Sequence, residues 1–365
     1  MMPDDHAILV GISRYLDADH YPPLEGPIND VEQVFQWLRS PGYNLPVLNI
    51  QKLVTHTSLM TPEPEVALMG QPSNSQFANA FDTIAYDKER KFRRRDGRLY
   101  LYFSGHGFSL QDDRATRAAL YGADCFNDYH RNLPGSLYAE AAKRAGLFRE
   151  IVLIMDCCRD VASEMEYAIP QLPKNEDDDS EGVKVLAIYA APRRGRAQER
   201  ELADANGKVV GLATNAWLRA LREAQCDLLG KVAASQLKQF ILNAWSDWYP
   251  EQTPPTPRFV MPEEEDLLFQ SGRHLVSQVF RLGKERVPGS RFRIRSEFQY
   301  VMGSVDGNGI KWDDQFLTRA YRSEWVGAHL PSRQFELRLP VDEFTLTMEG
   351  TTLTFTPGVQ HVIEV

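Results

Sequence analysis

Residues 99–107 read LYLYFSGHG, and residues 151–159 read IVLIMDCCR. Each stretch is an apolar run of five residues that ends at small, polar or nucleophilic side chains. Such runs are typical of strands buried on both faces of a parallel sheet. Ligand sites in these sheets lie beyond the carboxyl ends of the strands. We therefore expect the chemistry of the protein in the two loops that follow Phe103 and Met155.

The surrounding sequence alternates between strand and helix patterns. Short apolar runs predict further strands over residues 7–12, 50–54 and 184–190. Apolar side chains at helical spacing predict helices over residues 29–39, from Ser73 to the basic cluster at 88–95, and over 137–147, 212–221 and 232–245. The alternation indicates an α/β domain over residues 1–270, with helices on both faces of the sheet.

The pattern changes near Arg273, after five prolines between Pro250 and Pro262. Segments such as FELRLPV (335–341) and FTLTMEG (344–350) alternate apolar and polar side chains. Alternation at period two is typical of strands with one solvated face. We expect a small all-β, sandwich-like domain over residues 273–365.

Composition limits the classes of function. The 365 residues carry 41 Lys and Arg against 50 Asp and Glu, a formal net charge of −9, which argues against general nucleic-acid binding. With 43% hydrophobic residues the chain is not wholly disordered, and no apolar stretch approaches the roughly 18 residues of a membrane span. The four cysteines lack metal-ligand spacing, and the acidic N-terminal segment differs from a signal peptide. We expect a cytoplasmic protein that interacts with neither membrane nor nucleic acid.

The loops after the two apolar runs carry the side chains of nucleophilic catalysis. A cysteine nucleophile needs a nearby base, and His106 follows the first run while Cys157 and Cys158 follow the second. Glycines beside His106 allow a close backbone approach, so the amides of Gly107 and the nucleophilic cysteine could form an oxyanion hole. Taken singly, such a cysteine is commonly a core residue and such a histidine a turn residue. Only their conjunction predicts catalysis.

The sequence resembles the caspase-like cysteine peptidases, in particular the metacaspases and paracaspases. YLYFSGHG and IVLIMDCCRD resemble the histidine and cysteine blocks of that family, which lie about 50 residues apart. PINDV (27–31), GLATNAWLRAL (211–221) and QTP (252–254) resemble further family segments. The resemblance covers residues 5–270. It implies a three-layer sandwich around a mostly parallel six-stranded sheet, and peptide-bond hydrolysis by a Cys–His dyad. We expect a prokaryotic source.

Two cysteines compete for the role of nucleophile. The family pattern D-x-C selects Cys158 and leaves Cys157 as the intervening residue, although Cys157 stays an alternative. Metacaspases usually have Ser before the nucleophile and His after it, whereas Arg after it, as in Arg159, occurs in paracaspases. Because neighbouring residues of a strand point in opposite directions, only one of the two thiols can face His106.

The resemblance also implies a basic P1 residue, the residue before the scissile bond. In the metacaspase and paracaspase branches the Asp of D-x-C, here Asp156, lines the S1 pocket and pairs with Arg or Lys. Asp30 matches the second acidic S1 position, and Glu199 or Glu201 could supply a third acid. Alternatively, Asp30 is a charge favoured by a helix N-terminus and Asp156 caps a loop.

The resemblance also bears on regulation. In the family, the segment after the cysteine strand often contains a processing site, here the acidic loop 161–183 with Lys174 as its candidate. Arg193 and Arg194 are further candidates. We expect no cofactor; Ca²⁺ bound by the acids of 176–179 is the alternative. The expected partners are basic peptide substrates and an activating protein. The rival functions are a non-catalytic scaffold and a dyad peptidase with Asn or Asp at P1.

Overall fold

The computed structural model describes most of the chain. The described residues are 4–40, 43–55, 71–110, 117–126, 131–162, 166–168, 170, 172–173, 182–224, 226, 230–250, 254–263, 265–270, 275–281, 291–295, 300–306, 309–312, 334–340, 344–348, 351–356 and 362–364. Among the helices of these segments, none combines the length and the hydropathy that crossing a membrane requires. Two compact units divide the chain, Met1–Ala220 with Ala234–Leu267, and Leu221–Ala233 with Leu268–Val365. The boundary expected near residue 270 stays a prediction.

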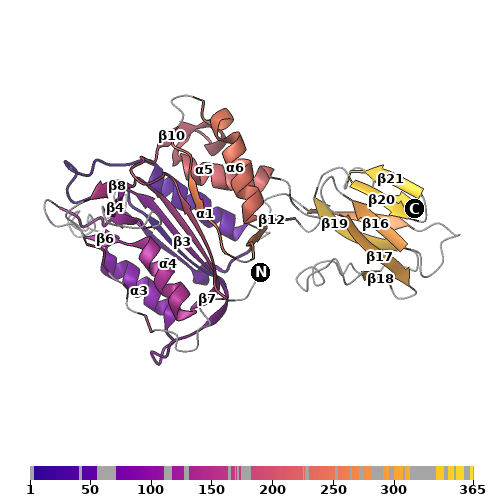
Figure 1. Ribbon diagram of the computed structural model, residues 1–365, viewed down its shortest axis with the longest axis horizontal. Helices are drawn as coiled ribbons and strands as arrows, with labels where there is room; N and C mark the ends of the chain where they lie inside the picture. Colours follow the sequence, from indigo (N-terminus) through magenta and orange to yellow (C-terminus); the bar gives the residue numbers. More distant parts are fainter. Residues whose placement is uncertain are drawn as a thin grey trace, which may run out of the picture. The chain divides into compact units, whose positions relative to one another are not determined.

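A six-stranded sheet forms the centre of the first unit (Figure 1). From edge to edge its strands are β13 (Arg258–Val260), β9 (Lys184–Tyr189), β7 (Phe148–Cys157), β3 (Arg95–Gly105), β1 (His6–Gly11) and β2 (Ile50–Val54). All neighbours pair in parallel except β13, which runs antiparallel to β9. The expected mostly parallel six-stranded sheet is confirmed.

The two quoted apolar runs are the two central strands of this sheet. No side chain of residues 99–103 is more than 3% exposed, and none of residues 151–155 is more than 4% exposed. Both faces are covered, so apolar side chains are favoured at every position of these strands rather than at alternate ones.

Helices pack against both faces of the sheet, as Figure 1 shows. One face is covered by α1 (Gly26–Arg39), α5 (Leu212–Glu223) and α6 (Ala234–Trp248), and the other by α3 (Asn74–Ala85) and α4 (Gly135–Ala145). The predicted capping box starts α3, since Ser73 and Gln76 each accept a backbone hydrogen bond from the other. α1 begins before the predicted residue 29 because Pro27 fits the first turn of a helix.

Short strands extend the structure beyond the carboxyl ends of β3 and β7. A small sheet contains β4 (Gly107–Leu110), β5 (Ala119–Tyr121), β6 (Asn132–Leu133) and β8 (Asp160–Ala162). A hairpin of β10 (Glu199–Leu202) and β11 (Lys208–Gly211) leads directly into α5. Two 3₁₀ helices lie at Val47–Asn49 and Ala203–Ala205. These additions supply much of the surroundings of the candidate site.

Apart from the last residues of α5, the elements described in the second unit are strands. β12 (Lys231–Ala233) pairs with β14 (Leu268–Gln270). A three-stranded sheet contains β15 (Leu275–Arg281), β19 (Gln334–Pro340) and β22 (Val362–Glu364), and a five-stranded sheet contains β16 (Arg291–Arg295), β17 (Tyr300–Asp306), β18 (Gly309–Trp312), β20 (Phe344–Met348) and β21 (Thr351–Phe355). The rings of Phe280 in one sheet and Phe355 in the other lie 5.2 Å apart. Two sheets in contact through buried aromatic rings form the expected sandwich.

Candidate active site

The register of β3 and β7 brings the two predicted loops to the same edge of the sheet. Ser104 pairs with Asp156, and Gly105 pairs with Cys157. His106 directly follows Gly105 at the end of β3, and Cys158 directly follows Cys157 at the end of β7. Gly105 has φ +151°, and a Cβ on it would lie 2.8 Å from the Tyr15 hydroxyl, so only glycine fits this turn. The register therefore places His106 and Cys158 one residue beyond paired positions, at the carboxyl ends of neighbouring strands.

Hydrogen bonds orient His106. Its backbone N–H donates to the Tyr15 hydroxyl at 2.8 Å, and its ring packs against the rings of Tyr15 and Tyr21. Nε2 lies 2.8 Å from the carbonyl oxygen of Pro22. A carbonyl oxygen can only accept, so Nε2 carries the proton and, in the neutral ring, Nδ1 is the acceptor nitrogen. Nδ1 is therefore the atom available to act as a base.

The two adjacent cysteines differ in burial. Cys157 is 1% exposed and belongs to the apolar core, whereas Cys158 is half-buried with its Sγ 3.7 Å from the Ala197 carbonyl oxygen. Burial raises the pKa of both thiols, and raises that of Cys157 well beyond its usual range. A Cβ on Gly107 would lie 2.6 Å from the Cys157 Sγ, so a glycine allows the loop to pack there. These environments favour Cys158 as the reactive thiol.

Asp30 and Asp156 converge behind this edge of the sheet. Asp30, on α1, accepts hydrogen bonds from the Ser104 hydroxyl at 2.9 Å and the Gly211 N–H at 2.8 Å. Asp156, on β7, accepts from both the N–H and the hydroxyl of Thr214, at 2.9 and 2.6 Å. A Cβ on Gly211 would contact the Oδ2 atoms of both acids. The two carboxyl groups predicted to share a pocket therefore approach the same point.

Burial dominates the electrostatics of this acid pair. Asp30 and Asp156 are 1% and 5% exposed. Burial, followed by the neighbouring Asp156, raises the pKa of Asp30 well above its ordinary value. Burial raises the pKa of Asp156 to about 6, against the hydrogen bonds from Thr214, which lower it. A cation that enters beside such a buried pair stabilises it, because the positive charge favours the ionised form of the carboxyl groups.

Glu199 is the third acid, and the structure distinguishes it from Glu201. Its carboxylate accepts from the N–H groups of Glu25 and Gly26 at the start of α1, at 3.1 and 2.8 Å. It also raises the pKa of Asp156, after the effects of burial and Thr214. Glu201 is exposed on the same hairpin. Glu199 is therefore the candidate that faces the acid pair.

Sequence reasoning missed the neutral residues that hold these groups through side chains or, for Gly211, through the backbone N–H. They are Tyr15 and Tyr21 beside His106, and Ser104, Gly211 and Thr214 beside the acids. Ser104 lies inside the quoted SGHG motif and Thr214 inside the GLATN segment. Both were visible as motif members, but the partner of neither could be found from spacing alone.

Arg159 clamps the loop that follows Cys158. Its side chain is fully buried, with Nε donating to Ser109 Oγ at 3.2 Å and the guanidinium 4.5 Å from the centre of the Tyr189 ring. Its backbone N–H donates to the Gly195 carbonyl oxygen at 2.9 Å, and its carbonyl oxygen accepts from Arg194 at 2.9 Å. The residue that departs from the metacaspase pattern thus ties the cysteine loop to the loop that leads to Glu199.

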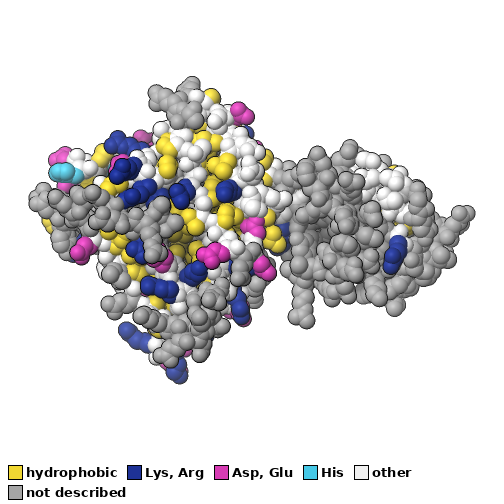
Figure 2. Space-filling view, viewed as in Figure 1, with side chains coloured by type: hydrophobic (Ala, Val, Ile, Leu, Met, Phe, Trp, Pro, Cys, Tyr) yellow, Lys and Arg dark blue, Asp and Glu magenta, His cyan; other side chains and the backbone are white. Residues whose placement is uncertain are grey.

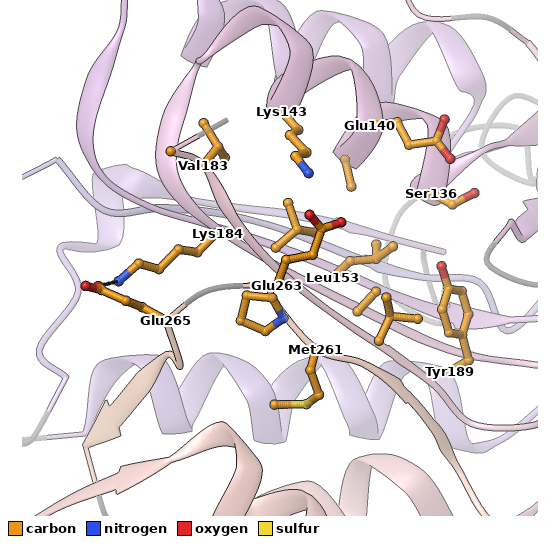
Figure 3. A pocket seen from close by; sticks show the side chains of 16 residues that line it. Ser136, Glu140, Lys143, Leu153, Val183, Lys184, Tyr189, Met261, Glu263 and Glu265 are labelled. Atoms are coloured by element: carbon orange, nitrogen blue, oxygen red, sulfur yellow. Dashed lines mark hydrogen bonds and ion pairs between the residues drawn. The ribbon is translucent and has the colours of Figure 1, made fainter. Parts of the chain in front are cut away.

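A cavity of about 710 Å³ lies elsewhere on the sheet, between α4, β7, β9 and the segment after β13 (Figure 3). Leu153, Val185 and Tyr189 are among its lining residues, and Figure 3 shows Lys143 and Glu263 extending into it from opposite sides. It contains none of the predicted catalytic or S1 residues. This cavity is therefore separate from the candidate active site.

The surface of the first unit carries charges of both signs. On the visible face of the first unit, Lys and Arg side chains lie between acidic and apolar ones (Figure 2). Within the described segments, no group of three or more His, Cys, Asp or Glu side chains could hold a metal ion. The acids at 176–179 proposed for Ca²⁺ and the processing candidate Lys174 lie outside the described residues.

Comparison with known proteins identifies the family. The family model described as caspase domain matches residues 4–269. No curated protein matches the chain. Among solved structures, the chain is similar to caspase-1 from Spodoptera frugiperda, with 15% identity over 72% of this chain and 88% of that chain and a TM-score of 0.42. The family match covers well over half of the sequence and contains both strand-end loops. The chain belongs to the caspase domain family, whose members are of the cysteine peptidase type.

Proposed function

We propose that this protein is a cysteine endopeptidase that hydrolyses peptide bonds after Arg or Lys, with Cys158 as nucleophile and His106 as general base. The observation that carries the proposal is the buried pair Asp30 and Asp156 at the sheet edge where His106 and Cys158 also lie. A catalytic pair without such acids would support hydrolysis but would not favour a basic P1 side chain.

The proposed reaction follows from the orientation of His106. Nδ1 takes the proton of the Cys158 thiol, and the thiolate attacks the carbonyl carbon of the scissile bond. The amides of Gly107 and Cys158 stabilise the resulting oxyanion. When the tetrahedral intermediate collapses, the C–N bond breaks and the imidazolium protonates the leaving amine. Water, deprotonated by His106, then hydrolyses the thioester, and the proton returns to the Cys158 sulfur as the peptide acid leaves.

The acid pair explains the proposed P1 preference. A guanidinium or ammonium that leaves water loses several kcal/mol of hydration free energy unless a carboxylate meets it. Asp156 lies two residues before Cys158, and Asp30 approaches it at Gly211. Arg gains more than Lys because its planar group can make two hydrogen bonds to one carboxylate. Glu199 adds negative charge next to the pair. An acidic P1 side chain would be repelled by the same groups.

Replacement of the cysteines tests the dyad. Cys158→Ala and His106→Ala should each lower cleavage of an Arg peptide on the order of 10⁴-fold or more, and the double variant should be no worse than either single one, because the two groups act as a unit. Cys157→Ala is the matched control, one residue away, and should retain most of the activity. An inactive Cys157→Ala beside an active Cys158→Ala would reverse the assignment. Absence of cleavage in the wild type would favour the non-catalytic scaffold.

Regulation is part of the proposal. We infer a regulatory or cell-death and defence protease of the metacaspase or paracaspase type, cytoplasmic and prokaryotic, that is activated by processing or by a protein partner. Arg194 is exposed within the loop that Arg159 clamps, which supports this loop as a cleavage site with a basic P1 residue. Mass spectrometry of incubated protein should find new termini at 161–183 or 193–196 in the wild type and none in Cys158→Ala. Full activity of an uncut chain would contradict processing.

A further inference from the structure

Thr214 donates two hydrogen bonds to Asp156, one acid of the buried pair. It lies in the first turn of α5 and is 1% exposed. Its N–H and its hydroxyl both reach Oδ2 of Asp156, at 2.9 and 2.6 Å. The same hydroxyl oxygen lies 2.7 Å from the Tyr102 hydroxyl. One side chain thus connects Asp156 with a second buried hydroxyl on the neighbouring strand β3.

The direction of these hydrogen bonds is fixed by chemistry. An ionised carboxylate can only accept, so the Thr214 hydroxyl gives its single proton to Asp156. The Tyr102 hydroxyl must then donate to Thr214 Oγ1. In this chain Tyr102 donates to Thr214, and Thr214 donates to the Asp156 carboxylate, which is the final acceptor. A hydrogen bond to a charged acceptor is stronger than a neutral one, and neighbouring bonds in a chain polarise one another.

Asp30 and Asp156 differ in which of their carboxylate oxygens accept hydrogen bonds. Asp30 accepts one hydroxyl and one N–H on separate oxygens, from Ser104 and Gly211. Asp156 accepts both of its donors on Oδ2. No hydrogen bond to its Oδ1 is among those described. A carboxylate held through one oxygen keeps a fixed plane, and the other oxygen is the one able to meet an incoming cation.

We propose that Thr214 is a positioning residue, whose hydroxyl orients Asp156 so that Asp156 is the acid that meets a basic P1 side chain. This inference rests on the proposed function. Its electrostatic support is that the Thr214 hydrogen bonds oppose the effect of burial on the pKa of Asp156. The other titratable groups whose charges couple with Asp156 are Asp30, Glu199, Tyr102, Tyr249, Cys157 and Cys158.

A valine in place of threonine keeps the shape and removes only the hydroxyl. We expect Thr214→Val to lower kcat/KM for an Arg peptide about 10- to 100-fold, mainly through KM, as loss of a hydrogen bond to a charged group does. The acid limb of the pH–rate profile should move to higher pH, since Asp156 loses a bond that favours its ionised form. Thr214→Ser, which restores the hydroxyl, should return both quantities to near the wild-type values.

Two further measurements keep the inference falsifiable. If Thr214→Val does not fold, as judged by circular dichroism, Tyr102→Phe removes the donor to Thr214 and should move the acid limb in the same direction by less. Labelling of Cys158 by iodoacetamide reports on the thiol without any P1 side chain and should be unchanged in both variants. If Thr214→Val has the same acid limb and the same KM as the wild type, the role of Thr214 is overturned while the proposed function stands. A wild type that labels at Cys158 but cleaves no Arg peptide would overturn the proposed function, and this inference with it.

Discussion

The two ends of the central sheet both bury charged groups, but they treat them differently. At the amino end, Arg98 is 8% exposed and donates twice to Glu150, at 2.8 and 2.5 Å, and its backbone N–H donates to Asp5. At the carboxyl end, the donors described for Asp30 and Asp156 are all neutral hydroxyl and N–H groups. One end contains its own counter-charge, and the other leaves negative charge for a cation to neutralise.

The difference separates stability from function. In a buried ion pair each charge neutralises the other. Removal of one partner therefore leaves an uncompensated buried charge and destabilises the fold. A buried acid pair without a cation is costly to the folded state, and such perturbed groups concentrate at functional sites. The amino end should therefore respond to mutation through stability, and the carboxyl end through substrate selectivity.

The largest expected effect is on selectivity at the carboxyl end. Asp156→Ala should cost on the order of 3–5 kcal/mol in the transition-state free energy for an Arg peptide, by analogy with breaking a buried pair. Peptides with an uncharged P1 residue should lose far less, if they are cleaved at all. Glu201→Ala, an exposed acid on the hairpin that carries Glu199, is the matched control and should change neither. Equal losses for charged and uncharged P1 residues would remove Asp156 from the S1 pocket.

The second prediction concerns pH. The pKa of Asp156 is about 6 in the folded protein against an ordinary 3.8, so the folded state binds this proton more tightly than the unfolded state. Its contribution to stability is fully present below pH 3.8 and is lost as the pH rises through about 6, by at most about 3 kcal/mol at 1.4 kcal/mol per unit.

Thermal unfolding of two inactive proteins measures this loss. In the Cys158→Ala background, the added change Asp156→Asn removes the titrating group. The stability of the doubly substituted protein relative to Cys158→Ala should increase between pH 3.8 and about 6. A difference that is constant over this window, or that falls, would contradict the raised pKa of Asp156. The matching expectation for the active enzyme is that kcat/KM for Arg peptides rises through the same window.

The smallest expected effect lies at the amino end. Glu150→Ala should lower the free energy of unfolding by about 1–3 kcal/mol, because the buried Arg98 loses its partner. Asp96→Ala is the control, since its ion pair with Arg149 is exposed, at 81% and 72%, and its loss should stay within about 0.5 kcal/mol. Urea unfolding measures both changes. A change in P1 selectivity caused by Glu150→Ala would break the separation between the two ends.

The sequence was most informative where structure depends on neighbours along the chain. The apolar runs at 99–103 and 151–155 predict two strands of one sheet, and their ends bring His106 and Cys158 to the same edge. The capping box at Ser73 predicts the start of α3. These features could be predicted because periodicity and capping act over a few residues.

The partners of the acids could not be predicted in this way. Ser104 meets Asp30 across 74 positions and Thr214 meets Asp156 across 58, and no local pattern encodes such pairs. The choice between Glu199 and Glu201 required the tertiary structure, because the two acids lie two residues apart on the same strand and only the Glu199 carboxylate is described as accepting hydrogen bonds from the start of α1. The contacts of Arg159 could not be predicted either, because its partners lie on elements that are distant in the sequence.

We propose that the carboxyl end of the sheet recognises a basic P1 side chain for cleavage by Cys158. The most direct measurement is kcat/KM of the wild-type protein for peptides that are identical except for Arg, Lys, Asn or Asp at P1, with Cys158→Ala as the blank. We expect that Arg is cleaved best, Lys next, and Asp not measurably. Preferential cleavage of the Asp peptide would contradict both the S1 role of Asp30 and Asp156 and the assignment to the metacaspase and paracaspase type.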